Sequence, residues 1–358
     1  MEQKHLIFVF GTRPEAIKLA PLIIHAKDRA YKFDVCFTGQ HPDMVTPILD
    51  FFEIEVDHSF TLTNGKQSTE DFIHDCGRFI DGILEQCVYR YLIVQGDTMS
   101  VLAGALSAFR KKVEIVHVEA GLRSNNLKSP FPEEGIRQMV SRIASINFAP
   151  TSSAVRNLLA EGVNSARIHN VGNTVTDAIR LALLRSESYV RQDLFELKGD
   201  LVLFTAHRRE NFGENLRGIF DSLRLLALKH DVSIIFPVHL NPLVRDDAYE
   251  ILSNVPNVFL LEPLVYPELI WLINRSKFVI TDSGGIQEEA VSLGKMVIVL
   301  RDETEREEGV EVGLATLVGT DGMKFRARFR ILMSTAVSSG VSQVYGDGFV
   351  SQRILNII

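Results

Sequence analysis

Short apolar runs alternate with longer segments of helical periodicity along this chain, and this alternation limits its possible folds more than any other feature. Ten such runs are present, at residues 6–10, 33–37, 91–94, 114–118, 146–149, 201–205, 233–238, 258–261, 278–281 and 296–300. Short apolar runs of this kind are typical of strands buried on both faces of a parallel sheet, in which a crossover helix follows each strand. The pattern therefore predicts an α/β protein with helices on both faces of its parallel sheets.

The length and the spacing of the runs divide the chain in two. Its 358 residues suffice for two domains of roughly 150 residues each. Residues 177–200, helical and then strongly polar, separate the first five runs from the last five. We predict a Rossmann-like domain over 1–176, a connection over 177–200 and a nucleotide-binding Rossmann-like domain over 201–340. A helix within 341–358 is expected to pack back on the first domain.

The charge balance argues against a nucleic-acid-binding protein. Lys and Arg number 38 against 45 Asp and Glu, a net charge of −7, whereas nucleic-acid-binding domains carry a basic patch. No apolar stretch approaches the 18 to 20 residues of a membrane span, and no signal peptide is recognisable. The three cysteines have no Cys-x-x-Cys spacing, which disfavours a zinc site. We therefore expect a cytoplasmic protein with no nucleic-acid or membrane partner.

Polar, ionisable and glycine residues gather where the predicted strands end. Eight such clusters occur, at 11–15, 38–41, 95–98, 117–121, 206–210, 239–242, 282–285 and 301–306. Open α/β sheets bind ligands just outside the carboxyl ends of their strands. We therefore expect two doubly wound domains that face a central cleft, with the functional site in that cleft.

One of these clusters is suited to phosphate. Asp282, Ser283, Gly284 and Gly285 precede a helical segment that begins at Ile286, and backbone N–H groups at a helix start bind anions. A helix cap at Ser283 is the alternative. Cations follow several strands, at Arg13, Lys18, Arg208, Arg209 and Arg306. The Walker and Gly-x-Gly-x-x-Gly patterns are absent, so a nucleotide diphosphate is a better candidate ligand than ATP in a P-loop or NAD.

Three carboxylates are candidates for proton transfer. Asp97 and Glu119 follow strands, and Glu133 stands at a predicted helix start. Crowding and burial raise the pKa of a carboxyl group into the range of general acid–base catalysis, although Asp97 and Glu133 could also merely favour helix starts. His207 follows a strand within a polar segment and suits a phosphate or leaving-group oxygen. No Asp-x-Asp pattern is present, so we expect no metal ion.

Taken together, the clusters resemble the non-hydrolysing UDP-N-acetylglucosamine 2-epimerases, which have the two-domain glycosyltransferase-B fold. The resemblance extends from about residue 6 to about residue 350. The matching motifs are Gly11–Lys18, Gly96–Thr98, His117–Arg123, Pro132–Glu134 with Arg137, Ala206–Asn211, His239–Pro242, Asp282–Glu289, Thr304–Arg306 and Tyr345–Gly348.

The resemblance implies an isomerase that needs no cofactor and interconverts UDP-N-acetylglucosamine and UDP-N-acetylmannosamine. Its catalytic residues would be Asp97, Glu119, Glu133 and His207. Substrate would be bound by Arg13, Lys18, Arg137, His239, Ser283, Gly284, Gly285, Glu289 and Arg306. In the family's reaction the C2 proton is removed, UDP leaves C1 to give a glycal, and UDP returns while C2 is reprotonated on the opposite face.

The resemblance also implies regulation and assembly. A second UDP-N-acetylglucosamine would act as activator through Gln40, His41 and Arg208, although Lys66 follows the family pattern only in part. A homodimer that serves cell-surface polysaccharide biosynthesis is expected. The alternatives are a hydrolysing epimerase that releases N-acetylmannosamine, a 2-epimerase of a related UDP-sugar, a glycosyltransferase, and a sensor that binds nucleotide sugar without turnover.

Overall fold

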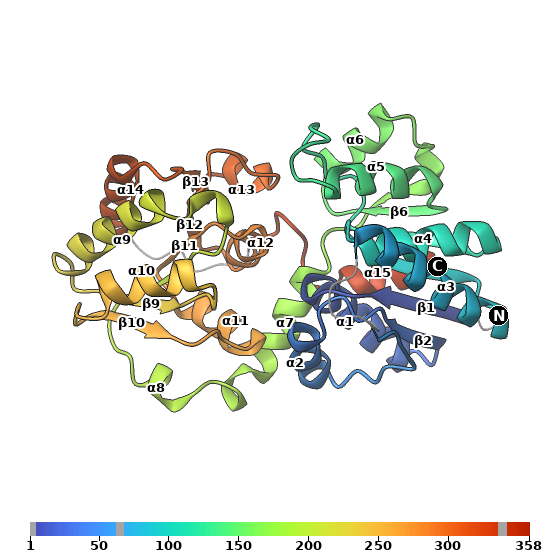
Figure 1. Ribbon diagram of the computed structural model, residues 1–358, viewed down its shortest axis with the longest axis horizontal. Helices are drawn as coiled ribbons and strands as arrows, with labels where there is room; N and C mark the ends of the chain where they lie inside the picture. Colours follow the sequence, from blue (N-terminus) through green and yellow to red (C-terminus); the bar gives the residue numbers. More distant parts are fainter. Residues whose placement is uncertain (1–4, 62–67, 336–341) are drawn as a thin grey trace. The chain divides into compact units, whose positions relative to one another are not determined.

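The computed structural model describes residues 5–61, 68–335 and 342–358, so Lys66 lies outside the described residues. The chain forms two compact units. Unit 1 comprises Met1–Ala178 and Tyr345–Ile358, and unit 2 comprises Ile179–Val344. From Ile179 onward, the segment predicted as a connection belongs to unit 2. Figure 1 labels many of the helices and strands of each unit.

Unit 1 is built around a parallel sheet of seven strands in the order β3-β2-β1-β4-β5-β6-β7. Its strands are β1 (His5–Phe10), β2 (Lys32–Phe37), β3 (His58–Ser59), β4 (Tyr91–Gln95), β5 (Glu114–Val118), β6 (Ile146–Ala149) and β7 (Ile168–Asn170). Its helices are α1 (Arg13–Asp28), α2 (Pro42–Phe52), α3 (Thr69–Gln86), α4 (Met99–Lys111), α5 (Glu133–Ile143), α6 (Ser152–Ala160) and α15 (Val350–Ile357), with a short 3-10 turn at Ser165–Arg167. Helix α7 (Val175–Arg185) contains the boundary between the units.

Helices cover both faces of this sheet, which explains why its inner strands are apolar throughout. On one face, Ile7 and Val9 of β1 belong to a buried cluster with side chains of α3, α4 and α5. The neighbouring residue Phe8 is equally buried, and alternate residues of a strand point to opposite faces. Helix α1 packs against β1, β2 and β4, and also against α15.

Unit 2 repeats this architecture with six parallel strands in the order β10-β9-β8-β11-β12-β13. Its strands are β8 (Leu201–Thr205), β9 (Ser233–Pro237), β10 (Val258–Leu261), β11 (Phe278–Thr281), β12 (Met296–Val299) and β13 (Ala315–Leu317). Its helices are α8 (Gln192–Phe195), α9 (Glu214–Ala227), α10 (Pro242–Leu252), α11 (Tyr266–Arg275), α12 (Gly284–Ser292), α13 (Glu307–Glu311) and α14 (Gly322–Ser334), with 3-10 turns at Ser186–Ser188 and Arg209–Asn211. Side chains of α9, α10 and α14 pack with β8, β9 and β11 in one core.

All ten apolar runs identified in the sequence form strands, and the predicted α/β class with two doubly wound parallel sheets is confirmed. The structure adds β3, β7 and β13, each of which lies at the edge of its sheet. No helix of the described ranges is long and apolar enough to cross a membrane.

Helix α15 belongs to unit 1 and lies beside α1 (Figure 1). Its N-terminus is held by Asp177, whose two carboxylate oxygens accept hydrogen bonds from the backbone N–H groups of Val350 (3.0 Å) and Ser351 (2.9 Å). Asp177 is fully buried. A carboxylate at this position satisfies helix N–H groups that have no partner within the helix.

Candidate active site

Arg13 is the first residue of α1, and the loop before it, Gly11 and Thr12, is fixed by Glu15. The Glu15 carboxylate accepts hydrogen bonds from the backbone N–H groups of Gly11 (3.1 Å) and Thr12 (2.7 Å) and from the Thr98 hydroxyl (2.8 Å). Glu15 is buried, and burial raises its pKa to about 7 despite these hydrogen bonds. The Glu15 carboxylate therefore connects the loop that precedes Arg13 to Thr98, the residue after Asp97.

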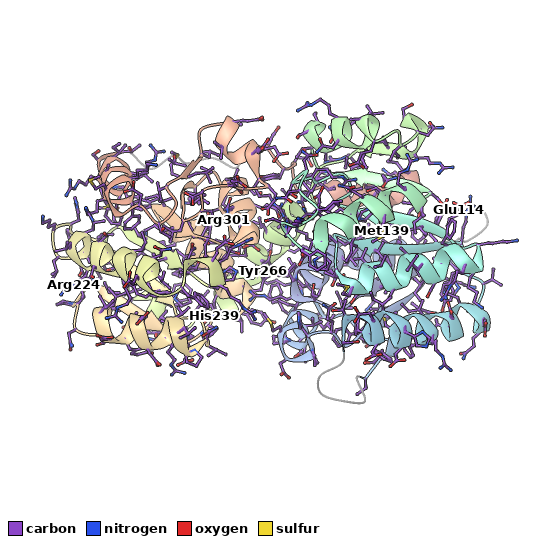
Figure 2. All side chains as sticks on the ribbon, turned by 45° about the horizontal axis from the view of Figure 1, so that its top comes forward. Glu114, Met139, Arg224, His239, Tyr266 and Arg301 are labelled. Atoms are coloured by element: carbon purple, nitrogen blue, oxygen red, sulfur yellow. The ribbon has the colours of Figure 1, made fainter. Side chains whose placement is uncertain are left out.

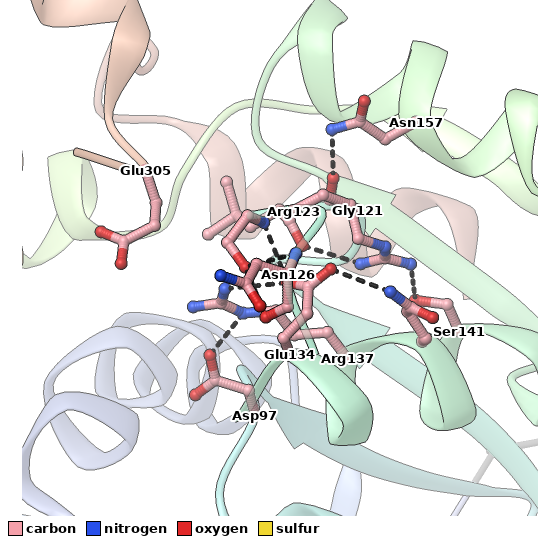
Figure 3. A network of polar contacts seen from close by, with 12 residues as sticks. Asp97, Gly121, Arg123, Asn126, Glu134, Arg137, Ser141, Asn157 and Glu305 are labelled. Atoms are coloured by element: carbon pink, nitrogen blue, oxygen red, sulfur yellow. Dashed lines mark hydrogen bonds and ion pairs between the residues drawn. The ribbon is translucent and has the colours of Figure 1, made fainter. Parts of the chain in front are cut away.

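Asp97 and Arg137, both predicted site residues, form an ion pair. Arg137 Nε donates to Asp97 Oδ2 over 2.6 Å, and the same guanidinium contacts the carboxylate of Glu134, as Figure 3 shows. Helix α4 is capped by Thr98, whose hydroxyl accepts from Val101 N–H. The sequence left open that Asp97 is only a helix cap, and this alternative is wrong because Thr98 has that role.

Glu134 anchors the other side of this network. It is fully buried, and burial alone would raise its pKa. The backbone N–H of Ser124, the Gln138 amide and the charge of Arg137 outweigh burial, so the pKa of Glu134 is lowered. The Glu134 carboxylate in turn holds the guanidinium of Arg137, which donates to Asp97.

Glu119 follows β5 and pairs with Lys18 of α1. Lys18 Nζ donates to Glu119 Oε2 in a pair that is almost fully buried. Glu119 also has a left-handed backbone, with φ of +63°. A non-glycine residue in that region is uncommon, and such conformations gather at functional sites. The same carboxylate oxygen accepts from the amide of Asn173 at 2.9 Å.

Glu133 is the first residue of α5, and its carboxylate is differently placed. Its Oε2 atom is buried and has no hydrogen-bond partner among the described residues. Arg13 likewise has no hydrogen bond or ion pair to any residue in the described ranges, and it is half-buried. Unpaired polar groups of this kind at the carboxyl edge of a sheet suit a polar ligand.

The predicted regulatory residues Gln40 and His41 follow β2 and contact the same edge of the sheet. Gln40 Oε1 accepts from the Ser100 hydroxyl at 2.9 Å, and the His41 backbone N–H donates to the carbonyl of Gly11 at 3.0 Å. A Cβ atom at Gly11 would collide with the hydroxyl of Ser100. Only glycine therefore allows the loops after β1, β2 and β4 to meet so closely.

In unit 2, His207 is oriented by Asp282, which the sequence placed only in the phosphate motif. His207 Nδ1 lies 3.0 Å from Asp282 Oδ1, and backbone N–H groups of His207 and Arg208 donate to the same carboxylate. Asp282 is fully buried. Burial would raise its pKa, but the His207 ring and these N–H groups outweigh it, and the pKa is lowered. An ionised Asp282 keeps the proton of neutral His207 on Nδ1 and leaves Nε2 for chemistry.

Ser283 occupies the N-cap position of α12, but its hydroxyl makes no cap hydrogen bond. Gly284 and Gly285 have ordinary backbone angles, and a Cβ atom at either would meet nothing within 4 Å. Neither strain nor packing within the described residues therefore requires glycine there. Close approach of a ligand to the N–H groups of a helix start would require it.

The remaining predicted residues of unit 2 lie on the same side of its sheet or on the elements next to it. The ring of His239, which Figure 2 labels, lies 6.1 Å from that of His207, between centroids. Arg208 Nε donates to the carbonyl of Asp282 at 3.0 Å. Arg306 pairs with Glu288, and Glu289 is buried on α12. Within the described residues, no three His, Cys, Asp or Glu side chains are arranged to hold a metal ion.

Comparison with known proteins identifies the chain. The family model described as UDP-N-acetylglucosamine 2-epimerase matches residues 25–358. The chain belongs to this epimerase family. Among curated relatives, the UDP-N-acetylglucosamine 2-epimerase of Salmonella borreze is 44% identical, with 98% of this chain and 97% of the relative covered. The enzyme of the same name from Escherichia coli K12 is 40% identical over 99% of this chain and 98% of its own.

Solved epimerase structures share the fold of this family member. The enzyme of Neisseria meningitidis bound to UDP-GlcNAc aligns with a TM-score of 0.90 at 37% identity, over 99% of both chains. The enzyme of Methanocaldococcus jannaschii in complex with UDP-GlcNAc and UDP aligns with a TM-score of 0.84 at 32% identity, also over 99% of both. The predicted resemblance to UDP-N-acetylglucosamine 2-epimerases is therefore confirmed.

Proposed function

We propose that the protein interconverts UDP-N-acetylglucosamine and UDP-N-acetylmannosamine. The observation that carries this proposal is the set of carboxylates Asp97, Glu119 and Glu133 on elements at the carboxyl edge of the unit 1 sheet. Two of them have a basic partner, and the third has an unpaired buried oxygen. A protein that only bound the nucleotide sugar would not need groups that exchange a proton with C2.

The reaction balances with the groups that this chain supplies. A carboxylate takes the C2 proton, the electrons of the C2–H bond form the C1–C2 double bond, and the C1–O bond breaks so that UDP leaves with its electron pair. UDP then attacks C1 again while a carboxyl group returns a proton to the opposite face of C2. Because Asp282 accepts from His207 Nδ1, it stabilises the protonated ring, and this imidazolium form can donate a hydrogen bond from Nε2 to the departing phosphate oxygen.

UDP would be held by groups of both signs. The start of α12, with Ser283, Gly284 and Gly285, offers backbone N–H groups to phosphate. Arg13, Lys18, Arg137, His239 and Arg306 are assigned to the diphosphate and the sugar, and Glu289 is assigned to the ribose hydroxyls. These assignments follow the family resemblance.

Proton NMR in D2O tests this function. We expect UDP-N-acetylglucosamine to yield UDP-N-acetylmannosamine with deuterium at C2, without added NAD and in the presence of EDTA. Free N-acetylmannosamine together with UDP would instead identify a hydrolysing epimerase. Product without deuterium at C2 would overturn the proposal.

We also infer activation by a second UDP-N-acetylglucosamine at Gln40, His41 and Arg208. The hydrogen bonds of Gln40 to Ser100 and of His41 to Gly11 support this, because they connect the candidate activator loop to the start of α4, just after Asp97, and to the loop that precedes Arg13. A sigmoidal dependence of rate on substrate, lost in Gln40→Ala, is the expected result. A hyperbolic dependence in the unmodified protein would contradict activation.

A homodimer is the assembly that we propose. Leu106 and Phe109 on α4 and Met139 on α5, which Figure 2 labels, are exposed apolar side chains, with Phe109 58% and Met139 50% exposed. These two helices pack against each other. Exposed apolar patches mark interaction surfaces. Light scattering should give twice the mass of the chain, and Phe109→Glu should give monomers.

A further inference from the structure

Glu119 receives both of its hydrogen bonds at one oxygen. Lys18 Nζ from α1 and Asn173 Nδ2 from the segment before α7 both donate to Oε2. Lys18 is the charged side chain that contacts Glu119 within the described part of the chain. The other oxygen, Oε1, accepts no hydrogen bond from the described residues. The two oxygens of one carboxylate are therefore in different environments.

The orientation of the Asn173 amide decides what Oε2 can do. Asn173 Oδ1 accepts a hydrogen bond from the backbone N–H of Val175 at 3.0 Å, and a backbone N–H is only a donor. The amide oxygen must face Val175, so the NH2 group must face Glu119. Because both neighbours of Oε2 are donors, Oε2 has to remain an acceptor, and a proton on Glu119 has to reside on Oε1.

Asn173 is itself held firmly. It is 2% exposed, and its backbone N–H donates to the carbonyl of Tyr345 at 2.6 Å. Gly172 beside it has φ of +93°, and a Cβ atom there would come within 3.0 Å of the Tyr345 carbonyl. The Tyr345–Gly348 motif, to which the reaction assigns no role, thus fixes the backbone from which the Asn173 side chain reaches Glu119.

We propose that Asn173 is a positioning residue that, together with Lys18, reserves Oε2 of Glu119 as an acceptor and directs proton exchange with the sugar through Oε1. This inference rests on the proposed epimerase function. The proton removed from C2 becomes an O–H bond at Oε1, and the C2–H electrons remain with the sugar. Holding Oε2 in place gives Oε1 one direction, which is what a near-attack geometry requires.

Two substitutions separate positioning from folding. Asn173→Ser shortens the side chain so that it no longer reaches Glu119, while its hydroxyl can still accept from Val175 N–H in the same local turn. We expect kcat to fall about 10-fold to 100-fold, with KM changed by less than about threefold.

Asn173→Asp keeps the size and the acceptor toward Val175 but places a second carboxylate against Oε2. Two carboxylates at this distance share a proton, which raises the pKa of the pair. The acidic limb of the kcat–pH profile should therefore move upward by about one pH unit or more.

Asn157→Asp is the matched control. Asn157 Nδ2 donates to the carbonyl of Gly121 at 3.0 Å. Gly121 is two residues after Glu119, but Asn157 makes no hydrogen bond to the Glu119 carboxylate within the described residues. This substitution makes the same change in atoms and charge, and its acidic limb should coincide with that of the unmodified protein. Melting curves and UDP calorimetry verify that each variant is folded.

The inference is overturned if Asn173→Ser turns over at the unmodified rate, or if Asn173→Asp and Asn157→Asp have the same acidic limb. The unmodified protein is measured in the same assay. Absence of C2 exchange there would refute the proposed function itself, whereas exchange there with unaffected Asn173 variants would refute only the positioning role.

Discussion

Replacing Asp282 by asparagine should slow turnover about 10-fold to 100-fold while leaving UDP affinity nearly unchanged. Asp282 is fully buried, lies 3.0 Å from His207 Nδ1, and accepts from two backbone N–H groups and the Asn211 amide. Asparagine has one acceptor oxygen and one NH2 group, so it cannot serve all of these donors. If its NH2 group faces the ring, His207 loses the partner that stabilises its protonated form.

The magnitude follows from that lost partner. A hydrogen bond to a charged group contributes about 1.5 to 3 kcal/mol, and each 1.4 kcal/mol or so of barrier corresponds to a factor of ten in rate. Turnover is measured by C2 deuterium exchange, and UDP affinity by calorimetry. A double-mutant cycle supplies the control, because Asp282→Asn should cost less than about threefold when His207 is already alanine. Independent, multiplying effects of the two substitutions would refute the role of Asp282 as the orienter of His207.

Three further predictions concern unit 1. Asp97→Asn removes the titrating oxygen but keeps the size, so kcat should fall on the order of 10² to 10⁴ with UDP affinity intact by calorimetry; a normal rate would reduce Asp97 to a partner of Arg137. Arg13→Ala removes a cation with no ion pair among the described residues, so steady-state kinetics should show KM rising as well as kcat falling, and an unchanged KM would contradict contact with the diphosphate. Burial, assisted by the charge of Arg123, lowers the pKa of His117 from 6.5 to about 4. As the pH falls, His117 is protonated in the unfolded chain at a higher pH than in the folded protein. The contribution of neutral His117 to the free energy of unfolding is therefore fully present above about pH 6.5 and is lost as the pH falls toward 4. Urea unfolding measures the free energy of unfolding at pH 7 and at pH 4.5. Between these pH values, that free energy should fall on the order of 2 to 3 kcal/mol more in the unmodified protein than in His117→Gln, and equal decreases would contradict a buried neutral His117.

The inner strands were predictable from sequence because burial on both faces leaves continuous apolar runs. The edge strands β3, β7 and β13 were not, because each has only two or three residues and lies where one side of the strand has no neighbour. His58–Ser59 and Ile168–Asn170 contain polar residues and give no apolar run. Such strands are defined by the neighbour with which they pair rather than by their own composition.

The candidate site divides in the same way. Asp97, Glu119 and His207 were predictable as polar residues that directly follow apolar strands. Asn173 was not, because its importance lies in a contact with Glu119, 54 positions away in the sequence. Asp282 stood in a recognised motif, but its role toward His207 depends on the pairing of β8 with β11. Residue type and local order indicate which groups lie at a sheet edge, whereas tertiary structure decides which groups touch.

The hydrogen bonds from α15 to Asp177 have a consequence for the order in which the protein is made. Asp177 leaves the ribosome 173 residues before Val350, and all of unit 2 is synthesised between them. Until then, Asp177 lacks both backbone donors, and the side of α1 that α15 covers remains open. The nascent first unit therefore lacks α15 until the inserted unit 2 has been translated. A ribosome that stops before residue 350 would release a chain whose first unit cannot close, however well its second unit has folded.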